Sequence, residues 1–371
     1  MRLEGAIPPE ILAAVRAPFV EAGGTSIVTP MAEPLGHYLD LAGEAMRERL
    51  FLVQGPGREE YCLRPDFTLG IAFAHIASGA ASGRYVYEGP AFRVAPPGSA
   101  RAEQFLQIGL EAYGTSYAPL ADASMASLAW RAASAGGRDD LSLLLGDVAL
   151  FGAFLAALGV PGPAASRLQA ALSRPARLAR ELAQPEPRPE TKGRLAEILV
   201  DLDEARAVAV LEEIWTVAGI EPVGGRGAAE IVHRLTTRAA AVAAPPLERA
   251  ERELIGRYLA IDDEPRAALA AVADLASGPT LDAALAAWKQ RGAALSEIPA
   301  TRTRLVTAFH RPFGYYDGML FEVRSEALGE DQAVAAGGRY DGLPARLGAA
   351  PGGRAVGCVV RPGRAWREGR S

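Results

Sequence analysis

Strand-like segments lie near both ends of the chain, and a long stretch with helical spacing of its apolar residues separates them. Before that stretch, the strand-like segments Arg84–Val94 and Ala102–Tyr113 are separated by a loop with two prolines and a glycine, so we expect them to pair antiparallel. From about residue 148 to residue 295, alanine and leucine dominate and apolar residues fall at helical spacing. Strand character returns in residues 296–371. The pattern predicts a mixed α and β protein in which a mainly helical insertion, 148–295, separates two sheet-forming parts, 1–147 and 296–371.

Turn and helix-end signals predict several shorter elements. Proline at its start and a glycine pair at its end favour a helix between Pro8 and Ala22. A Gly-Pro-Gly turn within Arg49–Leu63 indicates a β-hairpin. Asp122 is expected to cap an alanine-rich helix that ends at a glycine pair, and Leu141–Asp147 is expected to be a buried strand.

Composition and charge exclude several classes of function. The net charge of −5 gives no broad electrostatic reason to bind nucleic acid. Lys192 and Lys289 are the only lysines, and neither lies in a P-loop, so Schiff-base and P-loop chemistry lack their residue. Cys62 and Cys358 lack CxxC spacing and the four histidines lie far apart, so we expect no metal site. We expect a cytoplasmic protein, because no signal-peptide pattern and no apolar run of about 18 residues is present.

One predicted strand carries polar groups on a single face. Because side chains alternate along a strand, one face holds apolar residues and the opposite face holds a glutamine and a glutamate beside a glycine. Buried polar groups need partners, and a glycine leaves room above the backbone, so this face predicts a small polar ligand over Gly109. The alternative is a solvent-facing strand. The two faces are Phe105, Gln107, Gly109 and Glu111, and Leu106, Ile108 and Leu110.

Charged residues at element junctions are candidates for holding a ligand. Asp66 and Thr68 precede an apolar helix, where a carboxylate either caps the helix or binds an ammonium group, and both roles can coexist. Arg93 and Arg311 lie near turns, and a guanidinium group there suits a carboxylate or phosphate. The alternative for each is an arginine exposed to solvent on the protein surface.

Two further features bear on the same predicted site. Tyr315 and Tyr316 are adjacent, so in a strand they would point to opposite faces, with one in a pocket and the other in the core. The glycines of the run Gly337–Leu343 permit close approach of the backbone to a ligand or a packed neighbour.

Five segments taken in order resemble the catalytic domain of class II histidyl-tRNA synthetases. The resemblance covers roughly residues 1–145 and 300–365 and implies an α+β fold: an antiparallel sheet of six or seven strands flanked by helices, with a helical insertion, in a dimer. The segments are TPMAEP from Thr29, LRPDFT from Leu63, YEGPAFRV from Tyr87 with QFLQIGLEAYG from Gln104, HRPFGYYDGMLFEV from His310, and AGGRYDGL from Ala336.

The resemblance also implies a histidine-binding set. Asp66, Thr68 and Gln107 match positions that hold the α-amino group of histidine. Glu111 and one of the two tyrosines match positions that recognise the imidazole, and Tyr316 is the preferred tyrosine. A carboxylate can accept a hydrogen bond from the imidazole N–H. Arg311 matches the arginine near the histidine carboxylate. The full predicted set is Asp66, Thr68, Arg93, Gln107, Glu111, Arg311, Tyr315 and Tyr316.

The departures from the synthetase pattern concern ATP. After Arg93 the segment Val94–Pro97 lacks the family's carboxylate and arginine, Glu103 stands at an arginine position, and Gly314 replaces an acidic residue. The segment Val360–Arg364 departs from the family's terminal glycine and GLERL-type helix start. Each lost electrostatic contact typically costs about 10²- to 10³-fold in rate, so we expect no adenylation, no catalytic residue and no cofactor.

This combination resembles the regulatory subunits of ATP phosphoribosyltransferase, a synthetase-like family. The resemblance implies a chain without chemistry of its own that joins a short catalytic subunit at the first step of histidine biosynthesis and mediates feedback by histidine. Histidine would bind in the predicted pocket or at a subunit interface. It also implies no anticodon-binding domain, no tRNA partner and no membrane. Two alternatives remain, an active histidine-activating synthetase and a scaffold that activates its partner without sensing histidine.

Overall fold

The computed structural model describes residues 1–42, 44–56, 59–172, 174–183, 202–219, 228–229, 231–232, 247–311 and 314–367. The chain divides into two compact units, one of Met1–Phe154 with Arg257–Ser371 and one of Leu155–Gly256. Among the described residues, no helix combines the length and the apolar character that crossing a membrane requires.

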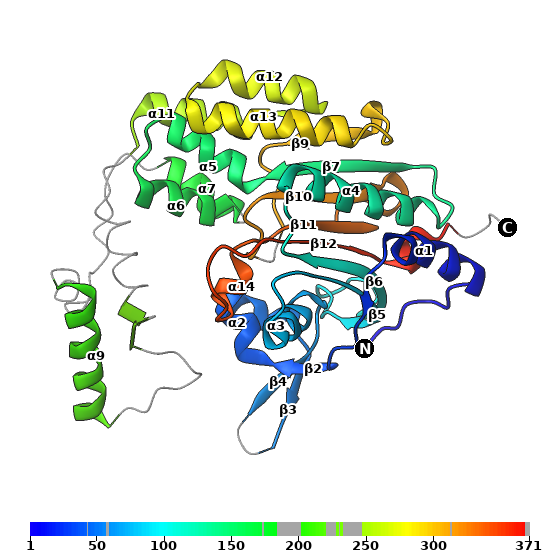
Figure 1. The fold of residues 1–371 in the computed structure, drawn as a ribbon, viewed down its shortest axis with the longest axis horizontal. Coiled ribbons are helices and arrows are strands. Elements are labelled where there is room, and N and C mark those ends of the chain that lie inside the picture. Colours follow the sequence, from blue (N-terminus) through cyan, green and yellow to red (C-terminus); the bar gives the residue numbers. More distant parts are fainter. Residues whose placement is uncertain are drawn as a thin grey trace. The chain divides into compact units, whose positions relative to one another are not determined.

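A nine-stranded sheet formed by described residues is the centre of the first unit (Figure 1). Its order is β1-β5-β6-β12-β11-β10-β7-β9-β8, and all neighbours are antiparallel except β1 with β5 and β7 with β9. The predicted antiparallel pairing of β5 with β6 is confirmed, and two-residue strands extend the sheet at both edges. The strands are β1 (Thr25–Ser26), β5 (Gly83–Phe92), β6 (Gln104–Tyr113), β7 (Leu141–Asp147), β8 (Asp262–Asp263), β9 (Thr303–Val306), β10 (Met319–Ser325), β11 (Ala335–Arg339) and β12 (Ala355–Val360).

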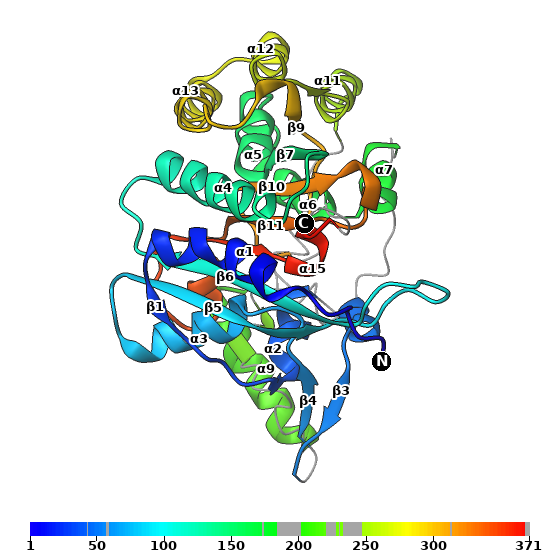
Figure 2. The ribbon, with the colours of Figure 1, turned by 90° about the vertical axis from the view of Figure 1, so that its right-hand side faces the viewer.

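Helices cover both faces of this sheet. On one face, α4 (Ala118–Ser134) packs on β11 and β12, and α1 (Pro9–Ala22) and α13 (Pro279–Ala294) pack against α4. Figure 2 shows α1 and α4 on one side of the central strands and α2 and α3 on the other. On that other side, α2 (Leu35–Ala42) and α3 (Thr68–Ser78) share a buried cluster with tyrosines of the sheet. The α+β fold of a mostly antiparallel sheet between helices is therefore confirmed.

A small three-stranded sheet of order β2-β4-β3 adjoins α2 in the chain. Its strands are β2 (Ala32–Pro34), β3 (Leu52–Gln54) and β4 (Glu60–Leu63). The antiparallel pairing of β3 with β4 confirms the predicted hairpin, while Gly57 and Arg58 of its turn lie outside the described residues.

The expectation that Asp122 caps a helix is wrong. Helix α4 begins at Ala118, one turn earlier, because Pro119 in its first turn favours a helix start there. Asp122 is instead buried within α4, where its two carboxylate oxygens accept hydrogen bonds from Arg339 at 2.7 Å and from Arg291 at 2.9 Å. Two guanidinium groups compensate the burial of this charge, which makes the residue a structural anchor rather than a cap.

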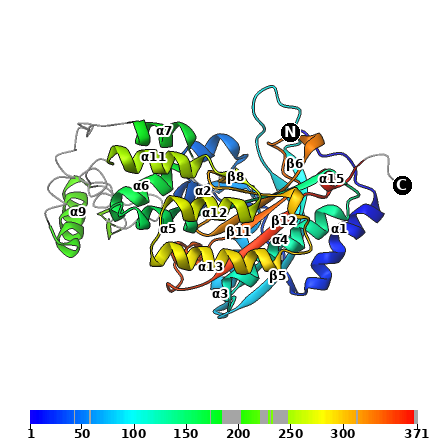
Figure 3. The same ribbon diagram turned by 90° about the horizontal axis from the view of Figure 1, so that it is seen from above.

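The predicted helical stretch contributes helices to both compact units. In the second unit the described helices include α6 (Gly162–Leu172), α7 (Pro175–Ala183) and α9 (Glu204–Ala218). In the first unit α12 (Pro265–Leu275) packs beside α13, as Figure 3 shows. The chain passes between the units within α5 (Val148–Ala157) and α11 (Arg249–Leu259). The short helices are η1 (Glu44–Arg49), η2 (Ala300–Arg302), η3 (Glu326–Leu328), α14 (Leu343–Arg346) and α15 (Pro362–Ala365).

Candidate ligand-binding site

A cavity lies on the sheet face that α2 and α3 cover. The strands β5, β6, β11 and β12, the start of α3 and the segment before β10 contribute to its lining. Its free space is close to that of a single water molecule, because the side chains around it are large. The polar residues that line it are Asp66, Thr68, Tyr87, Arg93, Glu111, Arg311, Tyr315, Tyr316 and Tyr340. Seven of the eight predicted site residues are therefore brought together here, and Gln107 is the exception.

Glu111 lies at the floor of the cavity and is 2% exposed. One carboxylate oxygen accepts a hydrogen bond from the Thr68 hydroxyl at 2.8 Å, and the other accepts one from the Tyr340 hydroxyl. The Tyr87 hydroxyl is a third hydrogen-bonding neighbour. Burial raises the pKa of Glu111 to about 8, and the hydroxyl donors oppose this rise without cancelling it. The site thus holds a buried carboxyl group that is ready to exchange a proton near neutral pH.

Two glycines let the site side chains lie against the sheet. Gly357 of β12 is the register partner of Glu111, and a Cβ atom on Gly357 would lie 1.6 Å from a carboxylate oxygen of Glu111. Gly109 is the register partner of Tyr87, and a Cβ atom there would lie 2.2 Å from the Tyr87 hydroxyl. The expectation of a ligand directly over Gly109 is therefore wrong, because the Tyr87 ring fills that space.

The other end of the cavity is charged. One oxygen of Asp66 accepts a hydrogen bond from the Thr68 backbone N–H at 3.2 Å, and its second oxygen is buried without a partner. Burial raises the pKa of Asp66, and the positive charges of Arg93 and Arg311 oppose that rise. The sequence predicts that Asp66 caps a helix, binds a ligand ammonium group, or does both. One carboxylate oxygen of Asp66 binds the backbone at the start of α3, and the other remains open to a ligand, as both roles together require.

The two predicted arginines have different surroundings. Arg93 donates from Nε to the Pro65 carbonyl oxygen at 2.8 Å. Arg311 donates from a terminal nitrogen to Glu322 at 2.5 Å, and its Nε is buried without a partner. Arg311 therefore keeps one buried N–H donor available for an anion beside the cavity.

Gln107 shares the polar face but does not line the cavity. It is buried opposite Gly89 of β5, and its side-chain carbonyl oxygen has no partner. Alternation along β6 was enough to predict that Gln107 shares the polar face of the strand. Whether the cavity reaches Gln107 depends on side chains of the neighbouring strands, which alternation does not describe. The α-amino role of Gln107 stays a prediction.

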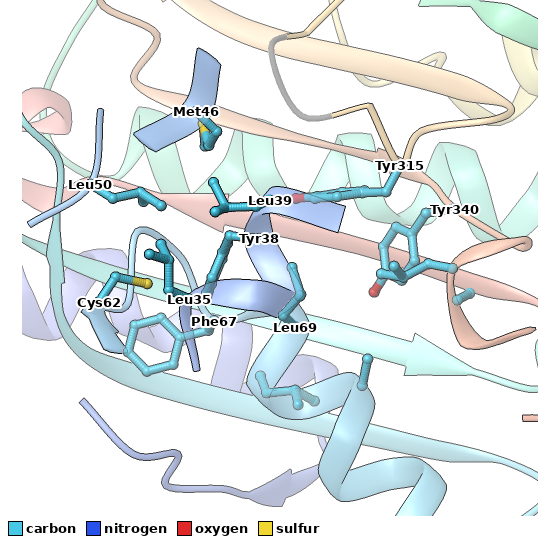
Figure 4. Close-up of a cluster of buried hydrophobic side chains, with 14 of the residues drawn as sticks. Leu35, Tyr38, Leu39, Met46, Leu50, Cys62, Phe67, Leu69, Tyr315 and Tyr340 are labelled. Atoms are coloured by element: carbon cyan, nitrogen blue, oxygen red, sulfur yellow. The ribbon is translucent and has the colours of Figure 1, made fainter. Parts of the chain in front are cut away.

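Both adjacent tyrosines line the cavity, so the expectation that only one would enter it is wrong. Tyr315 lies in a turn before β10 and Tyr316 directly follows that turn, so neither lies in a strand, and their ring centroids are 4.7 Å apart. Figure 4 shows Tyr315 and Tyr340 within the buried cluster that also includes Leu39 and Leu69. A turn lifts the strict alternation of a strand, which explains the difference.

Two site residues were not identified from the sequence. Tyr340 follows the glycines of β11, within a segment that carried the synthetase resemblance, and Tyr87 lies on the same face of the sheet as Glu111. Pairing Arg84–Val94 with Ala102–Tyr113 in the observed register would have indicated Tyr87, since it places this residue opposite Gly109.

The ionisation of buried carboxyl groups predicts a pH-dependent stability. The pKa of Glu111 rises from 4.5 to about 8 on folding, and burial raises that of Glu33 in β2 to about 7. Between the unfolded and folded values, the folded chain keeps protons that the unfolded chain has lost, so stability falls as pH rises. The slope is at most about 1.4 kcal/mol per pH unit for each group. Urea unfolding of the ligand-free chain at pH 5.5 and pH 8 should show this loss. In Glu111→Gln the loss should be smaller, and the part due to Glu33 should remain. An unchanged slope in that variant would contradict the assignment.

Comparison with known proteins shows what this chain is similar to. A protein-family model described as histidyl-tRNA synthetase matches residues 9–216 and 207–362. A protein of Agrobacterium fabrum named ATP phosphoribosyltransferase regulatory subunit is 34% identical over 351 residues, which are 92% of each chain. A protein of Brucella anthropi with the same name is 32% identical over 332 residues, 86% of each chain.

Solved structures share the fold. A structure from Bacillus halodurans, described as an ATP phosphoribosyltransferase regulatory subunit/histidyl-tRNA synthetase, has a TM-score of 0.63 at 19% identity and covers 96% of this chain and 78% of its own. The histidyl-tRNA synthetase of Nostoc has a TM-score of 0.60 at 16% identity, with coverage of 97% and 72%.

Proposed function

This chain belongs to the family of ATP phosphoribosyltransferase regulatory subunits, which shares the histidyl-tRNA synthetase fold, and we propose that its Glu111 cavity binds free histidine. Its role in histidine biosynthesis is regulatory rather than catalytic. The proposal assigns the cavity to the end product of the pathway, as an effector and not as a substrate.

The proposal rests on two side chains of opposite charge that line the same cavity, each with a buried atom that lacks a hydrogen-bond partner. Asp66 has a carboxylate oxygen without a partner, and Arg311 has an Nε without one. Leaving such groups unpaired costs free energy, so a ligand that pairs both is favoured. The ammonium and carboxylate groups of an amino acid match them, and Glu111 supplies an acceptor for an imidazole N–H.

Binding requires the cavity to open. Its free space is about that of one water molecule, so an amino acid enters only when side chains around it shift. Tyr316 is partly buried and directly follows a turn, whereas Glu111 is held in place by hydroxyl groups and a central strand. We propose that Tyr316 moves with its turn and that Glu111 stays. Histidine would then favour one arrangement of this segment over another.

We propose that this change reaches a short catalytic subunit of ATP phosphoribosyltransferase in a complex and slows it at the first step of histidine biosynthesis. Linkage then requires reciprocity: a substrate of the partner that favours the active arrangement weakens histidine binding by the same factor, typically about 5- to 150-fold. Identical histidine affinities with and without that substrate would contradict feedback through binding.

Self-association is proposed from an exposed apolar surface around the small sheet. Val28 is 92% exposed, Met31 55% and Leu52 50%, and the first two lie in the segment that leads into β2. Exposed apolar patches are typical of association surfaces, and we propose that these three side chains contribute to one. In analytical ultracentrifugation the unmodified chain should sediment as a dimer. The double variant Val28→Asp, Leu52→Asp should sediment as a monomer at the same concentration. Leu3→Asp, at a residue 67% exposed elsewhere, serves as the control and should leave the dimer intact.

Calorimetry tests the histidine proposal. L-Histidine should bind to the purified chain, and histamine, which lacks the carboxylate, should bind more weakly. Arg311→Met should weaken L-histidine binding by about tenfold or more, the size of one charge-assisted hydrogen bond, and leave histamine binding unchanged. Glu322 keeps its contact with Arg324 at 2.9 Å in that variant, so its charge is not left unpaired. Equal losses for both ligands would contradict the role of Arg311.

The two alternative functions have distinct results. Exchange of pyrophosphate into ATP that depends on histidine would show a synthetase. Activation of the catalytic subunit without any histidine binding would show a scaffold. Either result would contradict the proposal.

A further inference from the structure

One carboxylate joins the segment that carries the two cavity tyrosines, here called the tyrosine segment (residues 314–317), to the turn after β11. One oxygen of Asp317 accepts a hydrogen bond from the Asp341 backbone N–H at 2.9 Å, and its other oxygen accepts one from the Gly342 backbone N–H at 2.6 Å. The Asp317 backbone N–H also donates to the Arg339 carbonyl oxygen at 3.1 Å. These hydrogen bonds hold one end of the tyrosine segment.

The turn that Asp317 binds is itself fixed to the central sheet. The Asp341 carboxylate accepts hydrogen bonds from the Arg339 side chain and from the Ala355 backbone N–H, both at 2.8 Å. Arg339 ends β11 and Ala355 begins β12, so two neighbouring strands hold this turn. Tyr340, which lines the cavity, directly precedes the turn. Asp317 therefore fixes the tyrosine segment to a firmly held part of the cavity wall.

The same tyrosine segment closes the cavity. Its two tyrosine rings contribute to the lining, and the free space is close to that of a single water molecule. The Tyr316 ring lies against β11 at a glycine, where a Cβ atom on Gly338 would lie 2.9 Å from a ring carbon of Tyr316. The arrangement in which Asp317 binds the turn is thus the arrangement in which the cavity is too small for an amino acid.

Both ends of the tyrosine segment are held by side chains that reach water. Arg346 of α14 donates to the Gly314 carbonyl oxygen at 3.2 Å and, through its other terminal nitrogen, to the Leu41 carbonyl oxygen at 3.4 Å. Arg346 and Asp317 are exposed, whereas Glu111 is 2% exposed. When an exposed hydrogen bond breaks, water replaces the lost partner, so the break costs less than unpairing a buried group. The contacts of Asp317 can therefore break while those of Glu111 persist.

We propose that Asp317 is a positioning residue that sets the affinity of the chain for histidine. Its carboxylate holds the tyrosine segment closed over the empty cavity, and it releases the Asp341 and Gly342 N–H groups when an amino acid enters. Asp317 acts through the tyrosines and does not touch the ligand. When only a fraction of the chains is open, the apparent affinity is reduced by that fraction. This inference rests on the proposed binding of histidine in the cavity and extends it.

Binding of L-histidine to Asp317→Ala tests the inference. The variant loses both carboxylate contacts, so its open form is more populated, and L-histidine should bind about tenfold tighter or more. In stopped-flow measurements the association rate should carry this gain and the dissociation rate should stay unchanged, because the contacts are absent from the bound form. A merely structural role would weaken binding instead. Weaker or equal binding, or a gain that comes from slower dissociation, would overturn the inference.

Two more variants check the cause of the gain. Asp203 is also a carboxylate that accepts a backbone N–H, that of Arg206 at 2.9 Å, at the start of α9 in the second unit. Asp203→Ala should leave histidine affinity unchanged, and an equal gain there would overturn the inference. Gly342→Ala disturbs Asp317 by a second route, since a Cβ atom there would lie 2.9 Å from its carboxylate oxygen. The φ of Gly342 is −77°, which suits alanine, and this variant should also bind L-histidine more tightly.

Hydrogen exchange of the ligand-free chain separates this inference from the proposed function. Backbone amides of residues 314–318 should exchange faster in Asp317→Ala than in the unmodified chain, and those of β6 should not change. Unchanged exchange of residues 314–318 would overturn the inference even if histidine binds. If that exchange is faster but the unmodified chain binds no histidine, the proposed function is wrong and the closing contact of Asp317 stands.

Discussion

Replacing Glu111 with alanine lowers the affinity of the chain for L-histidine by about 100-fold. Leaving a buried donor without its hydrogen-bond partner costs about 1–3 kcal/mol, and each 1.4 kcal/mol corresponds to a factor of ten in the dissociation constant. Glu111 is the buried acceptor at the floor of the cavity, and alanine leaves an imidazole N–H without a partner there. Calorimetry of the purified variant measures the change.

Two controls separate binding from folding in this experiment. Alanine also leaves the hydroxyls of Thr68 and Tyr340 without their acceptor, so Glu111→Gln, which keeps the shape and one acceptor oxygen, is measured beside it. Glu88→Ala changes a carboxylate on the neighbouring strand β5 that pairs with Arg16, and it should bind histidine normally. If the folded Glu111 variants keep the affinity of the unmodified chain, histidine does not use this residue.

Replacing Gly357 with alanine disables the same site from the neighbouring strand. The new Cβ atom would lie 1.6 Å from a carboxylate oxygen of Glu111, which the hydroxyls of Thr68 and Tyr340 hold in place. Glu111 or β12 must then shift. Overpacking of this kind typically lowers the free energy of unfolding by about 1–3 kcal/mol, and we expect histidine affinity to fall by about tenfold or more. Urea unfolding and calorimetry measure the two effects.

A glycine a few residues away is the matched control for this prediction. At Gly353 a new Cβ atom would lie 3.9 Å from the Pro344 side chain, an ordinary packing distance. Gly353→Ala should therefore leave both stability and histidine binding close to those of the unmodified chain. If Gly357→Ala binds histidine as well as Gly353→Ala does, the position of Glu111 is not what makes the site.

Local sequence signals predicted much of the sheet because they depend on neighbours in the chain. Alternation along β6 placed Gln107 and Glu111 on one face, and the turn signals indicated both the β3–β4 hairpin and the β5–β6 pair. The same alternation was misleading for Tyr315, which lies in a turn where the strand period does not hold. The capping signal at Asp122 was misleading because two arginines distant in the sequence bind that carboxylate inside α4.

The parts of the site that sequence reasoning missed depend on pairing between distant strands. Tyr340 reaches Glu111 only because β11 and β6 both pair with β12. Tyr87 depends on pairing in the same way, since only the register of β5 with β6 places it opposite Gly109. These contacts follow from register, which no single segment of the sequence determines.

The most direct test of a histidine-sensing role measures the turnover of the assembled complex. The purified chain, or its Glu111→Gln variant, is mixed with a short catalytic subunit of ATP phosphoribosyltransferase, and the rate is followed at increasing L-histidine concentrations. Both complexes should be equally active without histidine, and histidine should inhibit only the complex with the unmodified chain. Equal inhibition of both complexes, or of neither, would contradict histidine sensing through this cavity.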